Sequence, residues 1–296
     1  MCIGIHVRGF DSGRPVAVEK ALERRAETIQ IFASNPRQWR LPPVSSQADR
    51  DLRRQMVKHE VSPLFLHAPY LVNLASPSPA TAESSFATVE WTLQRGSALG
   101  AAGVVVHAGH CVGSERTAAL AQSARAICRL MDAAPEGPRL LMELTSGARG
   151  ALASRLDHAE EVLDACGGHP RLGVCLDTCH VYAAGYDLAA PEGLEELVAG
   201  LEHLGVDRLG LIHTNDSRDP LGSRRDRHWH VGEGEIGLEG FRMLVEHRAL
   251  KHVPLVCETP GDVEEDRRNI GVLRGLRDGQ AAGGAGKNPS YDAHLL

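Results

Sequence analysis

Residues able to bind metal ions end most of the apolar runs in this sequence. One run reads Val-Val-Val-His107, the next reads Leu-Leu-Met-Glu143, and the one after it reads Val-Cys-Leu-Asp177. Imidazole and carboxylate groups are ligands that Zn²⁺ takes in proteins. A polar residue often follows a buried strand as the chain leaves the core, but this does not explain strong ligands in such succession. The run-ending residues are His67, His107, Glu143, Asp177, His213 and Glu258, and they predict a metal site.

Three further residues extend this set of candidate ligands. His180 follows Asp177 closely, and Asp226 and His228 form an Asp-x-His pair that can chelate one ion. Together the candidates exceed what one tetrahedral Zn²⁺ needs, and with a bridging carboxylate they would serve three ions. Mixed nitrogen and oxygen ligation favours Zn²⁺, with Mn²⁺ or Fe²⁺ as alternatives. Taken alone, Asp177 and His180 are equally compatible with a helix cap and a surface histidine.

Adjacent divalent ions are suited to displacement at phosphorus. They stabilise both the attacking and the leaving oxygen, and they generate hydroxide near neutral pH. The ligand set therefore predicts hydrolysis of a phosphoester. A metal-dependent sugar isomerase or epimerase is the competing class, but such sites use fewer histidines and often a lysine. No lysine ends an apolar run here, and Asp226 and His228 would be left without a role.

The elements that position these residues alternate between apolar runs and amphipathic helical segments. We expect the strands at residues 2–7, 28–33, 63–68, 103–108, 139–144, 172–177, 209–215 and 253–259. We expect the helices at residues 15–27, 47–60, 81–99, 114–133, 151–166, 191–204, 238–247 and 263–276. This alternation predicts an α/β fold, a (β/α)8 TIM barrel with the metal site at the carboxyl-terminal rim of the strands. A doubly wound sheet is the alternative, but no Gly-x-Gly-x-x-Gly turn supports a dinucleotide fold.

The composition is that of a soluble globular protein. Of 296 residues, 43% are hydrophobic and 24% are charged. We expect a single barrel domain over residues 1–278 and a disordered tail over 279–296, which is rich in glycine and poor in large apolar residues. The sequence has neither a membrane-spanning apolar run nor the charged and apolar regions of a signal peptide, so we expect a cytoplasmic location.

Charge and cysteine content restrict the chemistry further. The net charge of −6 argues against a generic nucleic-acid binder, but three bound Zn²⁺ ions would cancel it. The seven cysteines are odd in number and scattered, which argues against a disulfide framework. Cys175 and Cys179 are interpreted as buried small hydrophobic residues, because no second cysteine pair completes a four-cysteine site.

The motifs around the candidate ligands resemble those of the endonuclease IV family of apurinic/apyrimidinic endonucleases (AP endonuclease family 2). The resemblance runs from about residue 4 to residue 258, with the motifs in the family's order. They read Phe-Leu-His67-Ala-Pro-Tyr70-Leu-Val-Asn-Leu, Val-His107-Ala-Gly-His, Met-Glu143-Leu-Thr-Ser-Gly, Gly-Val-Cys-Leu-Asp177-Thr-Cys-His180, His213-Thr-Asn-Asp-Ser and Gly-Ser-Arg-Arg-Asp226-Arg-His228.

The resemblance implies a trinuclear zinc cluster at the top of the barrel. One ion would be held by His67, His107 and Glu143, a second by Glu143, Asp177, His213 and Glu258, and the third by His180, Asp226 and His228. The implied reaction is cleavage of the phosphodiester 5′ to an abasic site, leaving a 3′-hydroxyl and a 5′-deoxyribose phosphate, together with removal of blocking groups from 3′ ends. Glu143 and Glu258 would be the catalytic carboxylates, which place the attacking hydroxide and take its proton.

The resemblance also implies a partner, double-stranded DNA with abasic sites or blocked 3′ ends. Two loops would enter the DNA at the lesion, with Asn35, Arg37 and Gln38 on the first and Tyr70 and Leu71 on the second. Arg37 can stack and pair with phosphate, and Tyr70 with Leu71 can wedge an unstacked base step. Trp39 is interpreted as a packing anchor for its loop. We expect a monomer that associates with the nucleoid through its substrate.

A few positions depart from the family's pattern. The segment around His6 is only loosely like the family's opening, and His230 follows the Asp226-Arg-His228 motif closely enough to compete as a ligand. These departures leave open whether His6 or His230 takes part in the site, and which lesions besides abasic sites are cut. A lesion-binding protein without turnover is the alternative outside the enzymes, but the complete ligand set argues against it.

Overall fold

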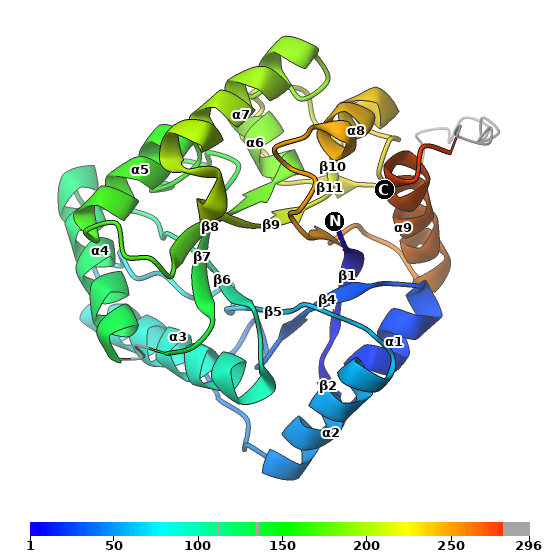
Figure 1. Ribbon diagram of the computed structural model, residues 1–296. Coiled ribbons are helices and arrows are strands. Elements are labelled where there is room, and N and C mark those ends of the chain that lie inside the picture. Colours follow the sequence, from blue (N-terminus) through cyan, green and yellow to red (C-terminus); the bar gives the residue numbers. More distant parts are fainter. Residues whose placement is uncertain (112, 134–135, 281–296) are drawn as a thin grey trace, which may run out of the picture.

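The structure is a computed structural model that describes residues 1–111, 113–133 and 136–280. Its centre is a closed barrel of eight parallel strands surrounded by helices (Figure 1). Around the barrel the strands are β1 (Ile3–Arg8), β12 (Leu255–Cys257), β9 (Leu209–His213), β8 (Leu172–Asp177), β7 (Arg139–Glu143), β6 (Gly103–His107), β5 (Leu64–His67) and β4 (Thr28–Phe32). Because β1 pairs with both β12 and β4, the barrel closes, and the predicted (β/α)8 fold is confirmed.

The outer helices lie within a few residues of the segments expected from the sequence. They are α1 (Ala17–Arg24), α2 (Ser46–Lys58), α3 (Pro79–Leu99), α4 (Arg116–Ala133), α5 (Leu156–Ala165), α7 (Pro191–Leu204), α8 (Gly237–Glu246) and α9 (Val263–Arg277). Local sequence sets several of their starts. At α3 the Ser78 side chain accepts a hydrogen bond from Thr81, and at α9 Asp262 and Glu265 form a capping box.

Apolar side chains fill the inside of the barrel. One layer there is made of Phe65, Val105, Leu141, Cys175, Leu211 and Val256, and each has at most 2% of its surface exposed. A larger apolar cluster packs the outer face of the strands against the helices. Strands buried on both faces explain why the runs in the sequence are continuously apolar rather than alternating.

Several short elements were not predicted. They are helix α6 (Thr178–Ala184), the 3-10 turn η1 (Val206–Arg208), the hairpin of β2 (Phe10–Asp11) and β3 (Arg14–Pro15), and the hairpin of β10 (Asp216–Ser217) and β11 (His228–Trp229). Segments this short carry no hydrophobic period that identifies them. The expected strand 209–215 accordingly ends at His213, and a separate strand begins at Asp216.

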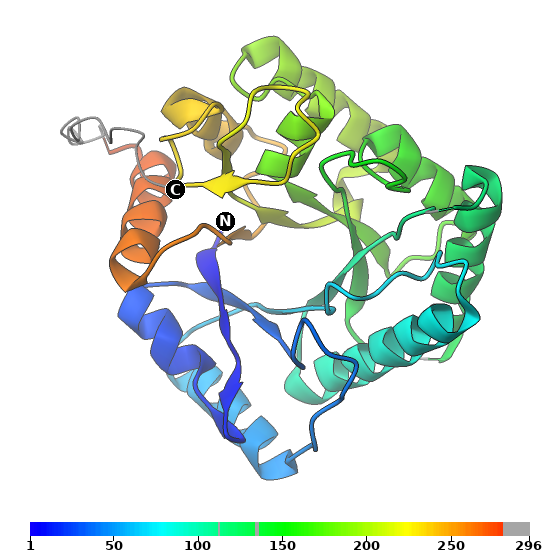
Figure 2. The same ribbon diagram turned by 180° about the vertical axis from the view of Figure 1, so that it is seen from behind.

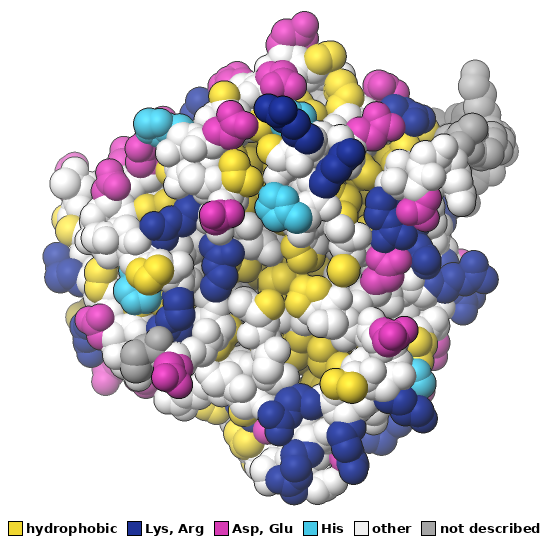
Figure 3. Space-filling view, in the orientation of Figure 1, with side chains coloured by type: hydrophobic (Ala, Val, Ile, Leu, Met, Phe, Trp, Pro, Cys, Tyr) yellow, Lys and Arg dark blue, Asp and Glu magenta, His cyan; other side chains and the backbone are white. Residues whose placement is uncertain are grey.

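The two faces of the barrel differ. Figure 2 shows the side of the β10–β11 hairpin, at which the strands end. Figure 3 shows the opposite face, where basic and acidic side chains are interspersed over most of the surface and Lys and Arg side chains gather at the lower edge, over α2. Among the described residues, no helix has the length and apolar character required to cross a membrane. From residue 281 on, the expected tail lies outside the described residues.

Candidate metal centre

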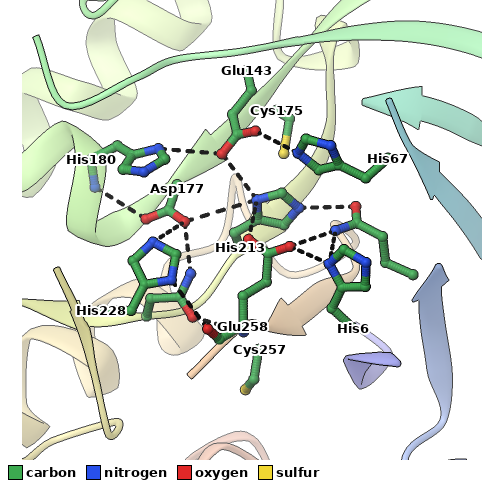
Figure 4. A network of polar contacts seen from close by, with 12 residues as sticks. His6, His67, Glu143, Cys175, Asp177, His180, His213, His228, Cys257 and Glu258 are labelled. Atoms are coloured by element: carbon green, nitrogen blue, oxygen red, sulfur yellow. Dashed lines mark hydrogen bonds and ion pairs between the residues drawn. The ribbon is translucent and has the colours of Figure 1, made fainter. Parts of the chain in front are cut away.

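The run-ending ligands converge at the carboxyl ends of the strands. Figure 4 shows His67, Glu143, Asp177, His213 and Glu258 pointing toward one another. Residues from the ends of several strands share one pocket in a barrel of this kind. His67, Glu143, Asp177 and His213 have at most 3% of their surface exposed. Charged groups buried this deeply need compensating charge or a metal ion.

The first cluster consists of His67, His107 and Glu143, from the neighbouring strands β5, β6 and β7. The β6–β7 register places His107 beside Glu143. Glu143 Oε2 lies 3.1 Å from His67 Nε2 and 3.2 Å from His107 Nε2. Their ligand atoms all lie within 4.8 Å of one another, so the three side chains are placed to share one ion.

The second cluster uses the other oxygen of Glu143. His213 Nδ1 lies 3.2 Å from Glu143 Oε1, 3.3 Å from Glu258 Oε2 and 3.9 Å from Asp177 Oδ2. These four residues again place their ligand atoms within 4.8 Å of one another. Glu143 thus stands between the two clusters, with one oxygen facing each, which is the arrangement of a bridging carboxylate.

The third cluster forms where α6 meets the β10–β11 hairpin. Asp226 Oδ1 lies 3.2 Å from His180 Nε2 and 3.1 Å from His228 Nε2. Two further residues lie nearby: Asp177 and the thiol of Cys179 each fall within a group of potential ligands that includes His228. The structure therefore brings the three predicted residues together but does not separate them from Asp177 and Cys179. Cys179 is fully buried, as expected, yet it lies beside a cluster and not in an apolar layer.

Three histidines of these clusters are oriented by hydrogen bonds from their second nitrogens. Nδ1 of His67 lies 2.6 Å from the Ala68 carbonyl. Nδ1 of His180 lies 3.1 Å from the Leu144 carbonyl, and Nδ1 of His228 lies 3.1 Å from the Glu258 carbonyl. A carbonyl only accepts, so each Nδ1 carries a proton, and Nε2 is the nitrogen that is left for an ion once it has lost its own proton. Nε2 of His180 and of His228 is buried and faces Asp226 without a well-formed hydrogen bond. Such orientation is typical of metal-bound histidines, and these residues fit an ion.

The ionisable groups of the three clusters shift one another's pKa values. Burial alone would raise the pKa of Glu143, but His213 and His107 outweigh it and hold that pKa well below its usual value. Burial lowers the pKa of His228, but Asp177 and Asp226 outweigh it and raise it to about 9. Protonated imidazoles therefore balance ionised carboxylates in the metal-free protein, and a divalent ion that replaced those protons would supply the same positive charge.

Asn215 was not predicted as part of the site, although it lies within the His213-Thr-Asn motif. Its side chain donates to Asp177 Oδ2 at 2.7 Å and accepts from the backbone N–H of Glu258 at 2.8 Å. The other oxygen of Asp177 accepts from the N–H of His180 and so caps α6. The helix-cap and ligand interpretations of Asp177 are therefore compatible, because each uses a different oxygen.

The residues predicted to contact DNA lie on two adjoining loops beside the clusters. The backbone N–H of Tyr70 donates to the Pro36 carbonyl at 3.1 Å, which joins the loops. Tyr70 is 55% exposed and its ring lies 5.9 Å from that of His67. Asn35, Arg37 and Gln38 are exposed and Leu71 is half-buried. A groove of about 990 Å³, lined by Asn35, Tyr70 and Glu258 among others, connects these loops with the second cluster. Trp39 is 38% exposed, more than expected of a packing anchor.

His6 and His230, which the sequence left open, have different surroundings. His6 Nδ1 lies 2.5 Å from Glu258 Oε1, so its ring borders the second cluster (Figure 4). His230 is buried and its Nδ1 lies 3.2 Å from the Asn269 amide nitrogen, which also donates to Thr259. His230 is absent from the groups of potential metal ligands among the described residues.

Fold and site together define a class, that of barrels with a candidate metal site, lined by histidines and carboxylates, at the carboxyl rim. Residues 18–277 match the family described as "Xylose isomerase-like TIM barrel". A D-tagatose 3-epimerase-like protein has the same fold, with a TM-score of 0.72 over 94% of this chain and 97% of its own, at 18% identity.

More similar proteins identify the family within this class. A "Probable endonuclease 4" of Streptomyces coelicolor is 41% identical over 94% of this chain and 95% of its own length, and that of Streptomyces avermitilis is 40% identical over 94% and 90%. The crystal structure of endonuclease IV from Thermus thermophilus has a TM-score of 0.84 and 32% identity, covering 94% of this chain and all of that one. The chain belongs to the endonuclease IV family, as its motifs predict.

Proposed function

We propose that this protein is a DNA repair endonuclease of base excision repair, which hydrolyses the phosphodiester 5′ to an abasic site in double-stranded DNA. The products would be a 3′-hydroxyl and a 5′-deoxyribose phosphate, and the same site would remove blocking groups from 3′ ends. One observation carries the proposal: five imidazoles and four carboxylates converge at the barrel rim of a chain that is 41% identical to a probable endonuclease 4.

Three zinc ions per chain are the proposed cofactors, with Mn²⁺ or Fe²⁺ as possible substitutes. Glu143 supports this number because its two oxygens face different clusters, and Asp226 with His180 and His228 adds a third group. Bound ions would supply a hydroxide nucleophile near neutral pH and offset the charge on the attacking and leaving oxygens.

The chain's own residues would orient the reactants and move the proton. Glu143 Oε1 and Glu258 Oε2 lie 3.2 Å and 3.3 Å from the same nitrogen of His213, so both carboxylates face one point of the site. Burial raises the pKa of Glu258, but His213 and His6 outweigh it and keep this pKa below its usual value. Both carboxylates are therefore ionised at neutral pH and able to accept the proton of an attacking water.

DNA would enter along the groove beside the two loops. Their exposed side chains surround the approach to the second cluster, where the extruded sugar must bring its phosphate. Double-stranded DNA with abasic sites or blocked 3′ ends is the proposed partner, and we propose that the protein acts as a monomer in the cytoplasm, at the nucleoid.

The test is nicking of a duplex that carries one stable abasic analogue, with zinc determined in the same samples. Incision on the 5′ side, lost after prolonged chelation in step with about three zinc ions per chain and restored by added zinc, is the expected result. No incision by fully loaded protein would overturn the proposal and direct attention to small phosphoesters and sugars.

Replacing Arg37 by Ala is expected to weaken binding to abasic DNA about tenfold, because a lost contact of about 1.4 kcal/mol changes Kd by that factor. Zinc content should stay the same, since Arg37 lies on an exposed loop outside the clusters. Binding is measured with chelated protein, so that no cleavage intervenes. Arg125→Ala, which removes the same charge from the exposed side of α4, is the control. Equal affinity of the two variants would remove Arg37 from the DNA interface.

A further inference from the structure

A buried glutamine stands between two of the candidate ligands. Gln30 lies on β4 within the sequence Thr-Ile-Gln-Ile-Phe and has no exposed surface. An amide removed from water costs free energy unless it is hydrogen-bonded. Gln30 is bonded at both ends of its amide: Oε1 lies 3.0 Å from His213 Nε2, and Nε2 lies 2.8 Å from Glu258 Oε1. It therefore links the end of β9 to the end of β12.

The donor and acceptor groups of the neighbouring residues determine which end of the Gln30 amide makes each contact. An ionised carboxylate only accepts, so the Gln30 nitrogen must be the atom that faces Glu258. The amide oxygen must then face His213, and because an amide oxygen only accepts, His213 Nε2 must carry a proton. Nδ1 of His213 is left as the nitrogen for an ion, and it is Nδ1 that faces Glu143, Asp177 and Glu258.

His6 holds the same oxygen of Glu258. Its Nδ1 lies 2.5 Å from Glu258 Oε1, and it lies 3.1 Å from the Gln30 nitrogen, so two donors converge on one carboxylate oxygen. The Phe32 ring lies 4.4 Å from the His6 ring and limits its movement. Glu258 Oε1 is thereby occupied, and Oε2 remains as the oxygen that faces the second cluster.

We propose that Gln30 and His6 are positioning residues, which together present Nδ1 of His213 and Oε2 of Glu258 to one ion of the site. Gln30 acts by selecting the protonated nitrogen of His213, and both residues act by keeping Glu258 Oε1 turned away from the ion. The proposal rests on the proposed function in taking that ion as zinc.

The two donors on Oε1 limit the number of oxygens that Glu258 can offer to an ion. A carboxylate that is free to rotate can bind an ion through both oxygens, whereas one held by two donors offers a single oxygen. Partners of this kind fix ligand orientation, and their loss typically weakens metal affinity or activity about 10- to 100-fold. Gln30 and His6 should therefore matter for zinc retention although neither is among the predicted ligands.

Two substitutions of Gln30 distinguish the effects of its two hydrogen bonds. Gln30→Met keeps the length of the side chain but loses both contacts, and Gln30→Glu keeps an acceptor for His213 but loses the donor to Glu258. Gln122→Met is the matched control, because Gln122 also makes two amide hydrogen bonds, in its case by donating to the carbonyls of Leu74 and Ser76 at 3.1 and 2.8 Å, outside the clusters.

Zinc release to a chromophoric chelator is the first measurement. One of the bound ions should be lost about 10- to 100-fold more readily from both Gln30 variants, while Gln122→Met resembles the parent protein. The second measurement is the Nε2 proton signal of His213 in zinc-loaded protein with ¹⁵N-labelled histidine. It should lie downfield, as expected of a hydrogen-bonded proton, in the parent protein and in Gln30→Glu, and it should move upfield in Gln30→Met, where the acceptor is missing. Parent-like zinc release by Gln30→Met, or an unchanged proton signal, would overturn the role of Gln30.

A second pair of variants tests His6 and also serves if Gln30→Met does not fold. His6→Asn keeps a side-chain N–H that can reach Glu258, and His6→Phe keeps a ring without a donor. We expect zinc retention and kcat close to the parent values for His6→Asn, with both reduced about tenfold or more for His6→Phe and KM little changed. Equal behaviour of the two variants would contradict a role through the hydrogen bond. The zinc and proton measurements use no DNA, so they decide this proposal even if abasic DNA is not the substrate.

Discussion

Glu143→Ala is expected to remove at least two zinc ions and to abolish incision. Its oxygens contact four imidazoles: Oε2 lies 3.1 and 3.2 Å from His67 and His107, and Oε1 lies 3.2 Å from both His180 and His213. Without this carboxylate the first cluster keeps two neutral ligands, and the second loses one of its three negative charges. Both sites therefore lose affinity at once, which no other single substitution in the centre achieves to the same degree.

The expected loss of incision is at least about a thousandfold, which corresponds to about 4 kcal/mol of transition-state stabilisation. Zinc per chain and steady-state nicking are measured on the same preparation. Glu161→Ala, which removes a half-exposed carboxylate that pairs with Arg116 on the outer helices, is the control. Full zinc content with normal nicking in Glu143→Ala would refute the bridging role.

The sequence predicted those parts of the site in which one short segment supplies both the element and the ligand. The run that ends in Glu143 is at once a buried strand and the carrier of a carboxylate, and the same holds for His107 and His213. Parallel strands in a barrel end at one rim, so their last residues meet without further information. The fold itself followed for the same reason, because the buried strands leave short continuous apolar runs in the sequence and the helices between them leave a helical period.

The remaining parts depend on contacts between distant segments. Gln30 is a polar residue inside an apolar run, a signal that the sequence offers, but its link to His213 arises only once β4 and β9 face each other across the barrel. The position of Cys179 beside Asp226 follows from the short helix α6, which is capped by Asp177 and has no period of its own. Contacts of this kind are set by tertiary packing and leave no local pattern.

A contact between distant residues also shapes the rim loop that carries Asp226 and His228, and its centre is the carboxylate of Asp216. Asp216, which is fully buried on β10, accepts hydrogen bonds from the backbone N–H groups of Ser217, Gly232, Gly234, Ile236 and Gly237 at 2.8 to 3.2 Å. The chain passes so close that a Cβ on Gly234 would lie 2.3 Å from the Ser217 carbonyl oxygen. One carboxylate thus organises the segment that follows His228, and the hairpin depends on that segment.

Asp216→Asn is therefore expected to destabilise the metal-free protein by about 2–6 kcal/mol, because the amide replaces one acceptor oxygen by a donor. Each oxygen of Asp216 accepts at least two of the N–H groups, so at least two buried donors lose their partner, at about 1–3 kcal/mol each. Urea unfolding of chelated protein gives the change in free energy. Asp187→Asn, whose carboxylate accepts a single exposed N–H from Ala189, is the control and should differ little from the parent protein.

Asp216→Asn should also weaken zinc binding at the third cluster more than at the other two. Asp226 and His228 precede the loosened segment, whereas the ligands of the first cluster lie on β5, β6 and β7, which Asp216 does not contact. We expect one zinc ion to be released early from Asp216→Asn and the others to be retained as in the parent protein. Simultaneous loss of all ions would mean that the barrel rim responds as a single unit. A parent-like unfolding midpoint would mean that the loop holds its shape without the carboxylate.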